Sequence, residues 1–342
     1  MDKSDILQIN NILSTPKQIA IIAHYNPDGD AIGASLALMM FLQQRGHIAN
    51  VLVPNSYPDF LGWMPYADTI TVATENMQLC EEKIRMANVI FCLDFNTLGR
   101  TGKLQEMLEN TSVPKILIDH HLNPDNSFNF VYSVTDQTSS TSELMYDFIV
   151  NIMDGEACMN KEIAECLYVG IITDTGSLNY SCNNVSTYQV LADLFRCRID
   201  GEAIHRKVYD NYSESRVRLL GHSLMERLIV LGEYATSFIY LTKKDLEKYE
   251  YKQGDIEGIV NYGLSMDNIR FTALFSERDD RIRISFRSKG NFDVNNFARE
   301  HFNGGGHKNA SGGNSYTTMD KTIEQFKSLL GQYKTALTLP WD

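Results

Sequence analysis

Short apolar runs that alternate with helical patterns constrain the fold of the first half of the chain. Runs typical of buried strands cover residues 18–23, 48–53, 88–93 and 115–118. Helical spacing of apolar residues covers residues 30–45, 142–153, 160–173 and 186–197. Strands that are separated by helices pair in parallel. We therefore expect an α/β fold built on a parallel sheet in this part of the protein.

The pattern changes after residue 197, where the chain becomes charged and helical up to residue 230. Strands are then predicted at 235–242, 268–276 and 281–287, the last two separated by a turn at residues 278–280, with helices at 293–302 and 319–334. The sequence thus predicts an α/β domain over residues 1–197, a helical connector over 198–230 and a smaller α+β domain over 231–342.

Acidic and histidine side chains follow several of the apolar runs. They are His24, Asp28, Asp30, Asp94, Asp119, His120, His121 and Asp174. An open α/β sheet forms its binding crevice where its strands end, so these side chains are expected to converge. Carboxylates and imidazoles without thiolates favour Mn²⁺ or Mg²⁺ over structural zinc. The pattern predicts a site for two divalent cations, which can activate water and stabilise a phosphoryl group under attack.

Each motif also has a purely structural interpretation. Asp28-Gly29-Asp30 could be a surface loop with a helix N-cap at Asp30, and Asp174 could close a helix. The segment Ser139–Ser142 could donate hydroxyls to the site, although capping of the following helix is favoured. Asp94 ends a wholly apolar run, where a carboxylate is costly unless it is paired, capping or metal-bound. The combination of all these residues favours a metal site.

Two further features predict contacts to a phosphorylated ligand. Gly304, Gly305 and Gly306 precede His307, and successive glycine N–H groups can form an anion nest. Arg287 ends the preceding strand and could face the same place. Arg100 follows Asp94 and could bind a phosphate bidentately. The alternatives are a flexible glycine turn and a solvated loop arginine.

Composition limits the classes of partner. The net charge of −12 disfavours long duplex nucleic acid as a substrate, while small phosphorylated molecules stay allowed. No apolar run is long enough to span a bilayer, and Met1–Asp5 does not resemble a signal peptide. The six cysteines form no Cys-x-x-Cys pair and are read as reduced core residues. We expect a cytoplasmic protein without a membrane partner; a homodimer is left open.

Together these residues resemble the DHH phosphoesterase family. The resemblance rests on His24-Tyr-Asn-Pro-Asp28-Gly-Asp30, Leu93-Asp94, Asp119-His120-His121, Asp174-Thr-Gly176 and Gly304-Gly-Gly-His307. The last motif is similar to the first type of DHH-associated domain. The whole arrangement is similar to the branch that degrades short RNA (nanoRNases) and removes phosphate from 3′,5′-bisphosphate nucleotides (pAp).

The resemblance implies roles for individual residues. It implies that the first metal ion is held by His24, Asp28 and Asp94, and the second by Asp30, Asp94, His120 and Asp174. His121 would lie beside the substrate phosphate, with Asp119 orienting the histidines. His307 and the glycines before it would grip the substrate. The active site would then lie in a cleft between the two domains.

The leading hypothesis is a Mn²⁺-dependent hydrolase of short oligoribonucleotides, linear dinucleotides such as pApA, and pAp. Mg²⁺ is the alternative ion. A processive single-strand exonuclease of the same superfamily would usually be longer and carry a basic path for the strand. A pyrophosphatase would need a different second domain. A non-catalytic nucleotide sensor is the alternative from another class, and the complete ligand set argues against it.

Overall fold

The computed structural model describes residues 1–135, 137–252 and 254–339. The chain divides into two compact units, Met1–Asn211 and Tyr212–Asp342. The boundary falls inside the segment predicted as a connector. Helix α8 (Gly201–Tyr209) belongs to the first unit, and α9 (Glu214–Glu226) belongs to the second.

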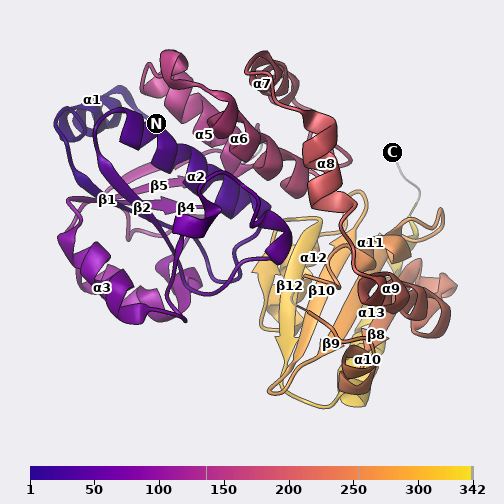
Figure 1. The fold of residues 1–342 in the computed structure, drawn as a ribbon. Coiled ribbons are helices and arrows are strands. Elements are labelled where there is room, and N and C mark those ends of the chain that lie inside the picture. The colour runs from indigo at the N-terminus through magenta and orange to yellow at the C-terminus, as the bar shows by residue number, and fades with distance from the viewer. Residues whose placement is uncertain (136, 253, 340–342) are drawn as a thin grey trace. The chain divides into compact units, whose positions relative to one another are not determined.

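The first unit is built on a six-stranded sheet in the order β3-β2-β1-β4-β5-β6, and every pairing in it is parallel (Figure 1). Its strands are β1 (Gln18–Ile22), β2 (Ile48–Val53), β3 (Thr71–Val72), β4 (Val89–Leu93), β5 (Lys115–Asp119) and β6 (Phe130–Ser133). The predicted α/β fold with a parallel sheet is therefore confirmed. Strand order reverses between β1 and β4, which makes their carboxyl ends the place where such sheets bind ligands.

Helices cover both faces of this sheet (Figure 1). They are α1 (Lys3–Ile12), α2 (Gly29–Gln44), α3 (Met77–Met86), α4 (Gln105–Asn110), α5 (Thr141–Asp147), α6 (Lys161–Asp174), α7 (Val185–Arg196) and α8. Alternate residues of β1 enter different cores, as a strand buried on both faces requires. Ile19 and Ile21 pack with α2, α5 and α6, while Ala20 and Ile22 pack with α3 and α4.

Glycines allow α2 and α6 to approach closely. A Cβ on Gly33 would lie 2.4 Å from the carbonyl oxygen of Cys166, and one on Gly170 would lie 2.8 Å from Asp30 Oδ1. A Cβ at either position would force the neighbouring atoms to move apart. The close packing matters for the site, because α2 carries Asp30 near its start and α6 ends at Asp174.

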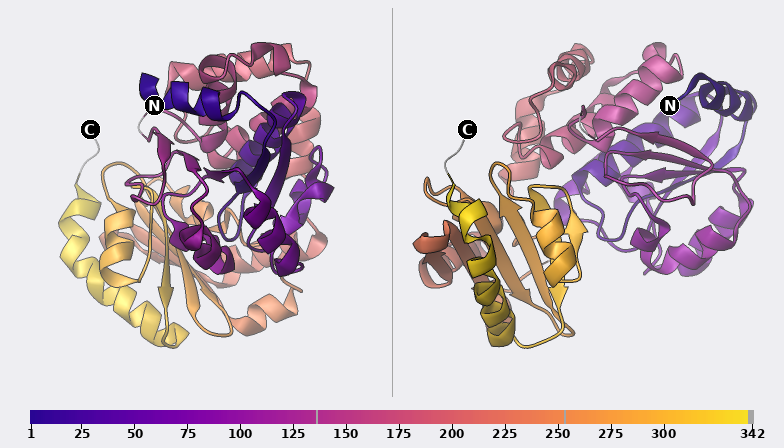
Figure 2. Two further views of the ribbon diagram at one scale, coloured as in Figure 1. Left: turned by 90° about the vertical axis from the view of Figure 1, so that its left-hand side faces the viewer. Right: turned by 180° about the vertical axis from the view of Figure 1, so that it is seen from behind.

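The second unit has a mixed sheet in the order β11-β12-β10-β9-β8-β7, with β8 and β9 parallel and the other pairs antiparallel. Its strands are β7 (Leu228–Leu231), β8 (Thr236–Leu241), β9 (Phe271–Glu277), β10 (Ile282–Ser288), β11 (Gly305–Gly306) and β12 (Ala310–Ser315), and its helices are α9, α10 (Lys243–Lys248), α11 (Ile259–Leu264), α12 (Val294–His301) and α13 (Met319–Thr338). Figure 2 shows the yellow helix α13 running along this sheet. Its Phe326 packs against Phe238 and Phe271 in a phenylalanine-rich core.

Several elements differ from the expectations. Strand β7 lies mostly in the segment predicted to be helical, so that prediction is wrong for residues 228–230. The helix predicted over 142–153 leaves α-helical geometry after Asp147 and continues as a π-helix over Phe148–Ile152. The elements α1, α3, α4, β3, β6, α10, α11, β11 and β12 were not predicted. In the described part of the chain, no helix combines the length and apolar character needed to cross a bilayer.

Candidate metal centre

His24 and Asp28 lie in the loop between β1 and α2. His24 is buried, and its Nδ1 lies 3.0 Å from the carbonyl oxygen of Tyr25. A carbonyl oxygen only accepts, so Nδ1 carries the proton and Nε2 is the nitrogen suited to bind a metal. Asp28 caps α2, because its Oδ1 accepts from the N–H groups of Asp30 and Ala31 at 3.1 and 3.2 Å. The alternative in which Asp30 is the N-cap is therefore wrong.

Asp94 occupies the centre of the cluster. It follows β4 with φ of +64°, a conformation that non-glycine residues seldom adopt and that gathers at functional sites. Its buried Oδ2 lies 3.3 Å from Nε2 of His24. Its Oδ1 lies 3.6 Å from Nε2 of His120 and 3.6 Å from Nδ1 of His121. The hydroxyl of Thr141 donates to the same oxygen at 2.9 Å. The carboxylate therefore faces His24 on one side and the histidines after β5 on the other.

The end of β5 supplies Asp119, His120 and His121. Asp119 is fully buried, and its Oδ1 lies 2.7 Å from Nδ1 of His121. An ionised carboxylate only accepts, so His121 carries its proton on Nδ1. Within residues 1–135, 137–252 and 254–339, Oδ2 of Asp119 has no hydrogen-bond partner. His120 turns the other way, with Nε2 3.4 Å from Oδ2 of Asp174 and 4.0 Å from Oδ2 of Asp30.

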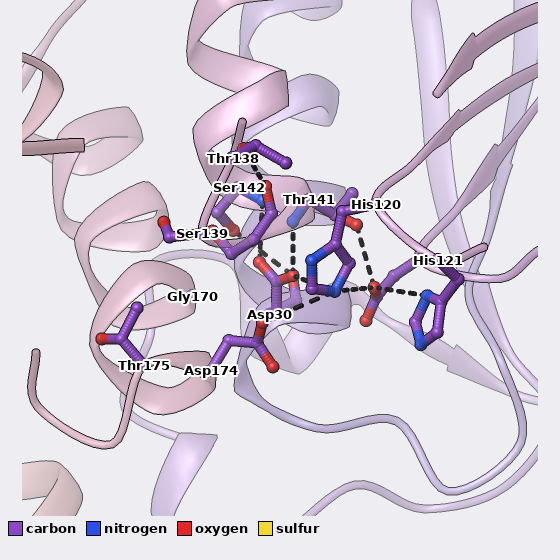
Figure 3. Close-up of polar contacts among 12 residues, drawn as sticks. Asp30, His120, His121, Thr138, Ser139, Thr141, Ser142, Gly170, Asp174 and Thr175 are labelled. Atoms are coloured by element: carbon purple, nitrogen blue, oxygen red, sulfur yellow. Dashed lines mark hydrogen bonds and ion pairs between the residues drawn. The ribbon is translucent and has the colours of Figure 1, made fainter. Parts of the chain in front are cut away.

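Asp30 is held by the start of α5 (Figure 3). Its Oδ2 accepts from the N–H of Thr141 at 2.7 Å, and its Oδ1 accepts from the N–H of Ser142 at 2.8 Å. Ser140 caps α5, so the capping role predicted for this serine-rich segment is confirmed. The segment also supplies the Thr141 hydroxyl to Asp94, which was the less favoured alternative. One turn of chain thus contacts two carboxylates of the cluster.

The pKa values of the buried carboxylates depend on burial and on the charges of their neighbours. Burial raises the pKa of Asp30 well above its ordinary value, and the negative charges of Asp94 and Asp174 raise it further against the opposing effect of His120. Burial also acts to raise the pKa of Asp94. The hydrogen bond with His24 and the charges of the histidines outweigh it and leave that pKa far below its usual range. Burial lowers the pKa of His24, but the hydrogen bond to Asp94 and the charge of Asp28 reverse the effect and raise it.

Arg100 lies beside this cluster in a 3₁₀ helix (Leu98–Leu104). Its Nη1 is 3.5 Å from the backbone oxygen of Asp94, and its charge opposes protonation of His24. The structure therefore brings Arg100 to the edge of the metal centre. Its predicted contact with a substrate phosphate stays a prediction.

The predicted contact residues of the second unit lie around β11. The N–H groups of Gly304, Gly306 and His307 donate within the unit, to Ala298 O, Asn295 Oδ1 and Ala310 O. These N–H groups already have acceptors, so the predicted anion nest is wrong for them. Close packing explains the glycine at position 304 instead, because a Cβ there would lie 1.9 Å from the carbonyl oxygen of Gly312.

Arg287, on β10, donates to the carbonyl oxygen of Phe286. For Arg287, Gly304, Gly305, Gly306 and His307, a role in binding substrate stays a prediction.

The residues of the first unit fit a pair of divalent cations. Donor atoms lie within 4.8 Å of one another in three groups: His24, Asp28 and Asp94; Asp30, Asp94 and His120; and Asp94, Asp119 and His121. Asp94 is common to all three. Buried carboxylates with imidazoles are ligands for Mn²⁺ or Mg²⁺, and a cation among them would relieve the repulsion that raises the pKa of Asp30.

One residue at this site escaped the sequence reasoning. Glu143 is buried three residues after the cap Ser140, a spacing typical of a capping box that could have drawn attention to it.

Comparison with known proteins gives matches along nearly the whole chain. A family model described as the N-terminal domain of the DHH family matches residues 18–171, and one described as the DHHA1 domain matches residues 232–336. The bifunctional oligoribonuclease and PAP phosphatase NrnA of Bacillus subtilis (strain 168) is 25% identical over 338 residues, which are 97% of this chain and 100% of the relative.

Two solved structures extend the comparison. An exopolyphosphatase-related protein from Bacteroides fragilis is 41% identical, with a TM-score of 0.94 over 99% of this chain and 98% of that chain. RecJ from Thermus thermophilus, solved in complex with Mn²⁺, is 13% identical, with a TM-score of 0.58 over 99% of this chain and 55% of that chain. The similarity to RecJ shows a shared fold only.

Proposed function

The chain belongs to the DHH family, and from this premise we propose that it is a phosphoester hydrolase acting on short oligoribonucleotides, linear dinucleotides such as pApA, and pAp. The observation that carries the proposal is the convergence of the predicted ligands around Asp94. The relative from Bacillus subtilis, named as an oligoribonuclease and PAP phosphatase, supports short oligoribonucleotides and pAp as substrates.

We assign the ligands to two of the three groups that share Asp94 and add Asp174 to the second. His24, Asp28 and Asp94 would hold one cation, and Asp30, Asp94, His120 and Asp174 would hold the other. Mn²⁺ is the proposed ion, and Mg²⁺ is the alternative. When bound, the two cations would supply Lewis-acid polarisation of the phosphoryl group and would lower the pKa of a coordinated water.

The protein's own residues fix the orientation and the proton positions of the histidines in the cluster. Asp119 fixes the proton of His121 on Nδ1, so a protonated His121 can also donate through Nε2 to a phosphate or to the leaving oxygen. Tyr25 O fixes His24 with Nε2 toward Asp94. Arg100, whose Nη1 lies 3.5 Å from the backbone oxygen of Asp94, is the proposed contact to a phosphate at the edge of the cluster. In the second unit, Arg287 and the loop Gly304–His307 are the proposed contacts to the rest of the substrate.

The net charge of the chain supports a short substrate over a long strand that is degraded processively. A strand-tracking enzyme needs a basic path along which the backbone can lie, whereas this chain has a net charge of −12.

A substrate panel tests the proposal. Purified protein with Mn²⁺ would be incubated with pAp, pApA, an RNA dinucleotide, an RNA pentanucleotide and a long RNA. We expect the short species to be hydrolysed and the long RNA to be spared. Asp94→Asn should abolish turnover, whereas the same exchange at the exposed Asp68 should leave it intact. Preferred attack on the long RNA would favour the exonuclease, and nucleotide binding without turnover would favour the sensor.

A further inference from the structure

A buried carboxylate next to the metal centre has no role in the function proposed above. Glu143, on the first turn of α5, is 5% exposed. It accepts four hydrogen bonds: from Ser139 N at 2.8 Å, Ser139 Oγ at 2.6 Å, Ser186 Oγ at 2.8 Å and Thr187 Oγ1 at 2.8 Å. All four donors are neutral. A buried carboxylate is costly unless its oxygens are hydrogen-bonded, and these four donors supply the bonds.

Glu143 holds the chain that leads into α5. Its carboxylate binds both the N–H and the hydroxyl of Ser139, and its own N–H donates to the Ser140 hydroxyl at 3.1 Å. Just before them, the Thr138 hydroxyl donates to the carbonyl oxygen of Ser140 at 3.2 Å. Residues 138–142 therefore form a turn, here called the serine turn, that is held by hydrogen bonds to the Glu143 side chain.

Thr141 and Ser142 of the serine turn face the metal centre (Figure 3). Thr141 and Ser142 give their N–H groups to the two oxygens of Asp30. The Thr141 hydroxyl donates to Asp94, the carboxylate common to the proposed ligand groups. A shift of this turn would therefore move the donors of both carboxylates together.

Helix capping alone does not account for Glu143. Ser140 already caps α5 by accepting from the N–H of Glu143. The contact between Glu143 Oε2 and Ser139 Oγ, at 2.6 Å, is in the range of charge-assisted hydrogen bonds, which are about twice as strong as neutral ones. The link to Ser186 and Thr187 ties the same carboxylate to α7. The side chain thus anchors the serine turn to a second helix.

We infer that Glu143 is a positioning residue for the metal centre: its carboxylate fixes the serine turn so that Thr141 and Ser142 orient Asp30 and Asp94 for binding the cations. The inference rests on the proposed metal-dependent function. Partners that orient metal ligands typically contribute about 10–100-fold to metal affinity or activity. Since Glu143 acts through the turn, its removal should fall near the lower end of this range, about tenfold.

The test is a calorimetric titration of the metal-free full chain with Mn²⁺, combined with turnover of pAp. Glu143→Ala should weaken Mn²⁺ binding about tenfold and lower kcat, with KM for pAp unchanged because the turn contacts the carboxylates. Glu143→Gln should restore most of the affinity. Its amide oxygen can replace Oε2, and its NH₂ group can donate to the Ser186 hydroxyl.

Tyr146→Phe is the matched control. It removes a separate hydrogen bond between α5 and α7, from the Tyr146 hydroxyl to Asp193 at 2.8 Å, and leaves the serine turn intact. It should lower the melting temperature without changing Mn²⁺ affinity. If Glu143→Ala fails to fold, Ser139→Ala replaces it, since this variant deletes the 2.6 Å contact and should weaken Mn²⁺ binding to a smaller extent.

The outcomes separate the two proposals. Normal Mn²⁺ affinity and kcat in Glu143→Ala, or in Ser139→Ala where that variant stands in, would overturn the positioning role while wild-type Mn²⁺ binding and turnover stand. An equal loss of affinity in Tyr146→Phe would also overturn it, because the effect would then follow from general loosening of α5. Absence of Mn²⁺ binding by the wild type would overturn the metal centre itself.

Discussion

Replacing Gly170 by alanine should separate steric cost from helix propensity at the metal centre. Gly170 lies in α6 against the start of α5. An added Cβ would lie 1.9 Å from Ser142 Oγ, 2.6 Å from Ser142 Cβ and 2.8 Å from Asp30 Oδ1. The Ser142 hydroxyl can rotate away, but its Cβ and the buried Asp30 carboxylate cannot. The helices must therefore separate, and the N–H donors of Asp30 move with α5.

Two opposing contributions to the free energy of unfolding, overpacking and helix propensity, can be given approximate sizes. Overpacking a core costs about 1–3 kcal/mol, whereas exchanging glycine for alanine inside a helix gains about 1 kcal/mol. The contacts at Gly170 involve atoms that are held on both sides, which places the steric cost near the top of its range. We expect a net loss of about 2 kcal/mol in the free energy of unfolding. For a unit of this size, that loss corresponds to a melting temperature lower by about 4–8 °C.

Thermal unfolding of the metal-free protein, followed by circular dichroism, measures this loss, and a Mn²⁺ titration measures the effect on the site. Gly331→Ala in α13 is the matched control, because a Cβ there meets no atom within 4 Å. It should raise stability by up to about 1 kcal/mol. A Gly170→Ala variant as stable as the wild type, with unchanged Mn²⁺ affinity, would refute the steric argument.

Three further predictions concern hydrogen bonds, charge and metal. Thr141→Val keeps the side-chain shape but removes the bond to Asp94; it should cost about 1.5–3 kcal/mol, measured by urea unfolding. Asp245 accepts from Arg227 and Thr242, which outweigh burial and lower its pKa, so its contribution to stability is complete above about pH 4 and is lost as the pH falls further. The difference in unfolding free energy between wild type and Asp245→Asn should therefore shrink in acid; a constant difference would contradict this. Adding Mn²⁺ should raise the melting temperature with concentration, and a chelator should reverse the rise. No shift at any concentration would speak against the metal centre.

Many features of the site follow from local sequence. His24, Asp94 and Asp119 each lie at the end of an apolar strand or within two residues after it, and parallel strands place their carboxyl ends at one edge of the sheet. The residues therefore had to lie near one another once the sheet order was set. Strand β6 and the short β11 escaped prediction because their pairing partners, rather than their own periodicity, hold them in the sheet.

The sequence by itself determined the parallel sheet and the residue types that gather at its edge, because both depend on periodicity and on position along the chain. Only the tertiary structure decided which atoms meet. That Asp94 faces both His24 and His120, that Asp30 accepts from the start of α5, and that Glu143 ties this turn to α7 all depend on contacts between segments distant in sequence. Such contacts are set by the packing of whole helices and strands, which no local pattern encodes.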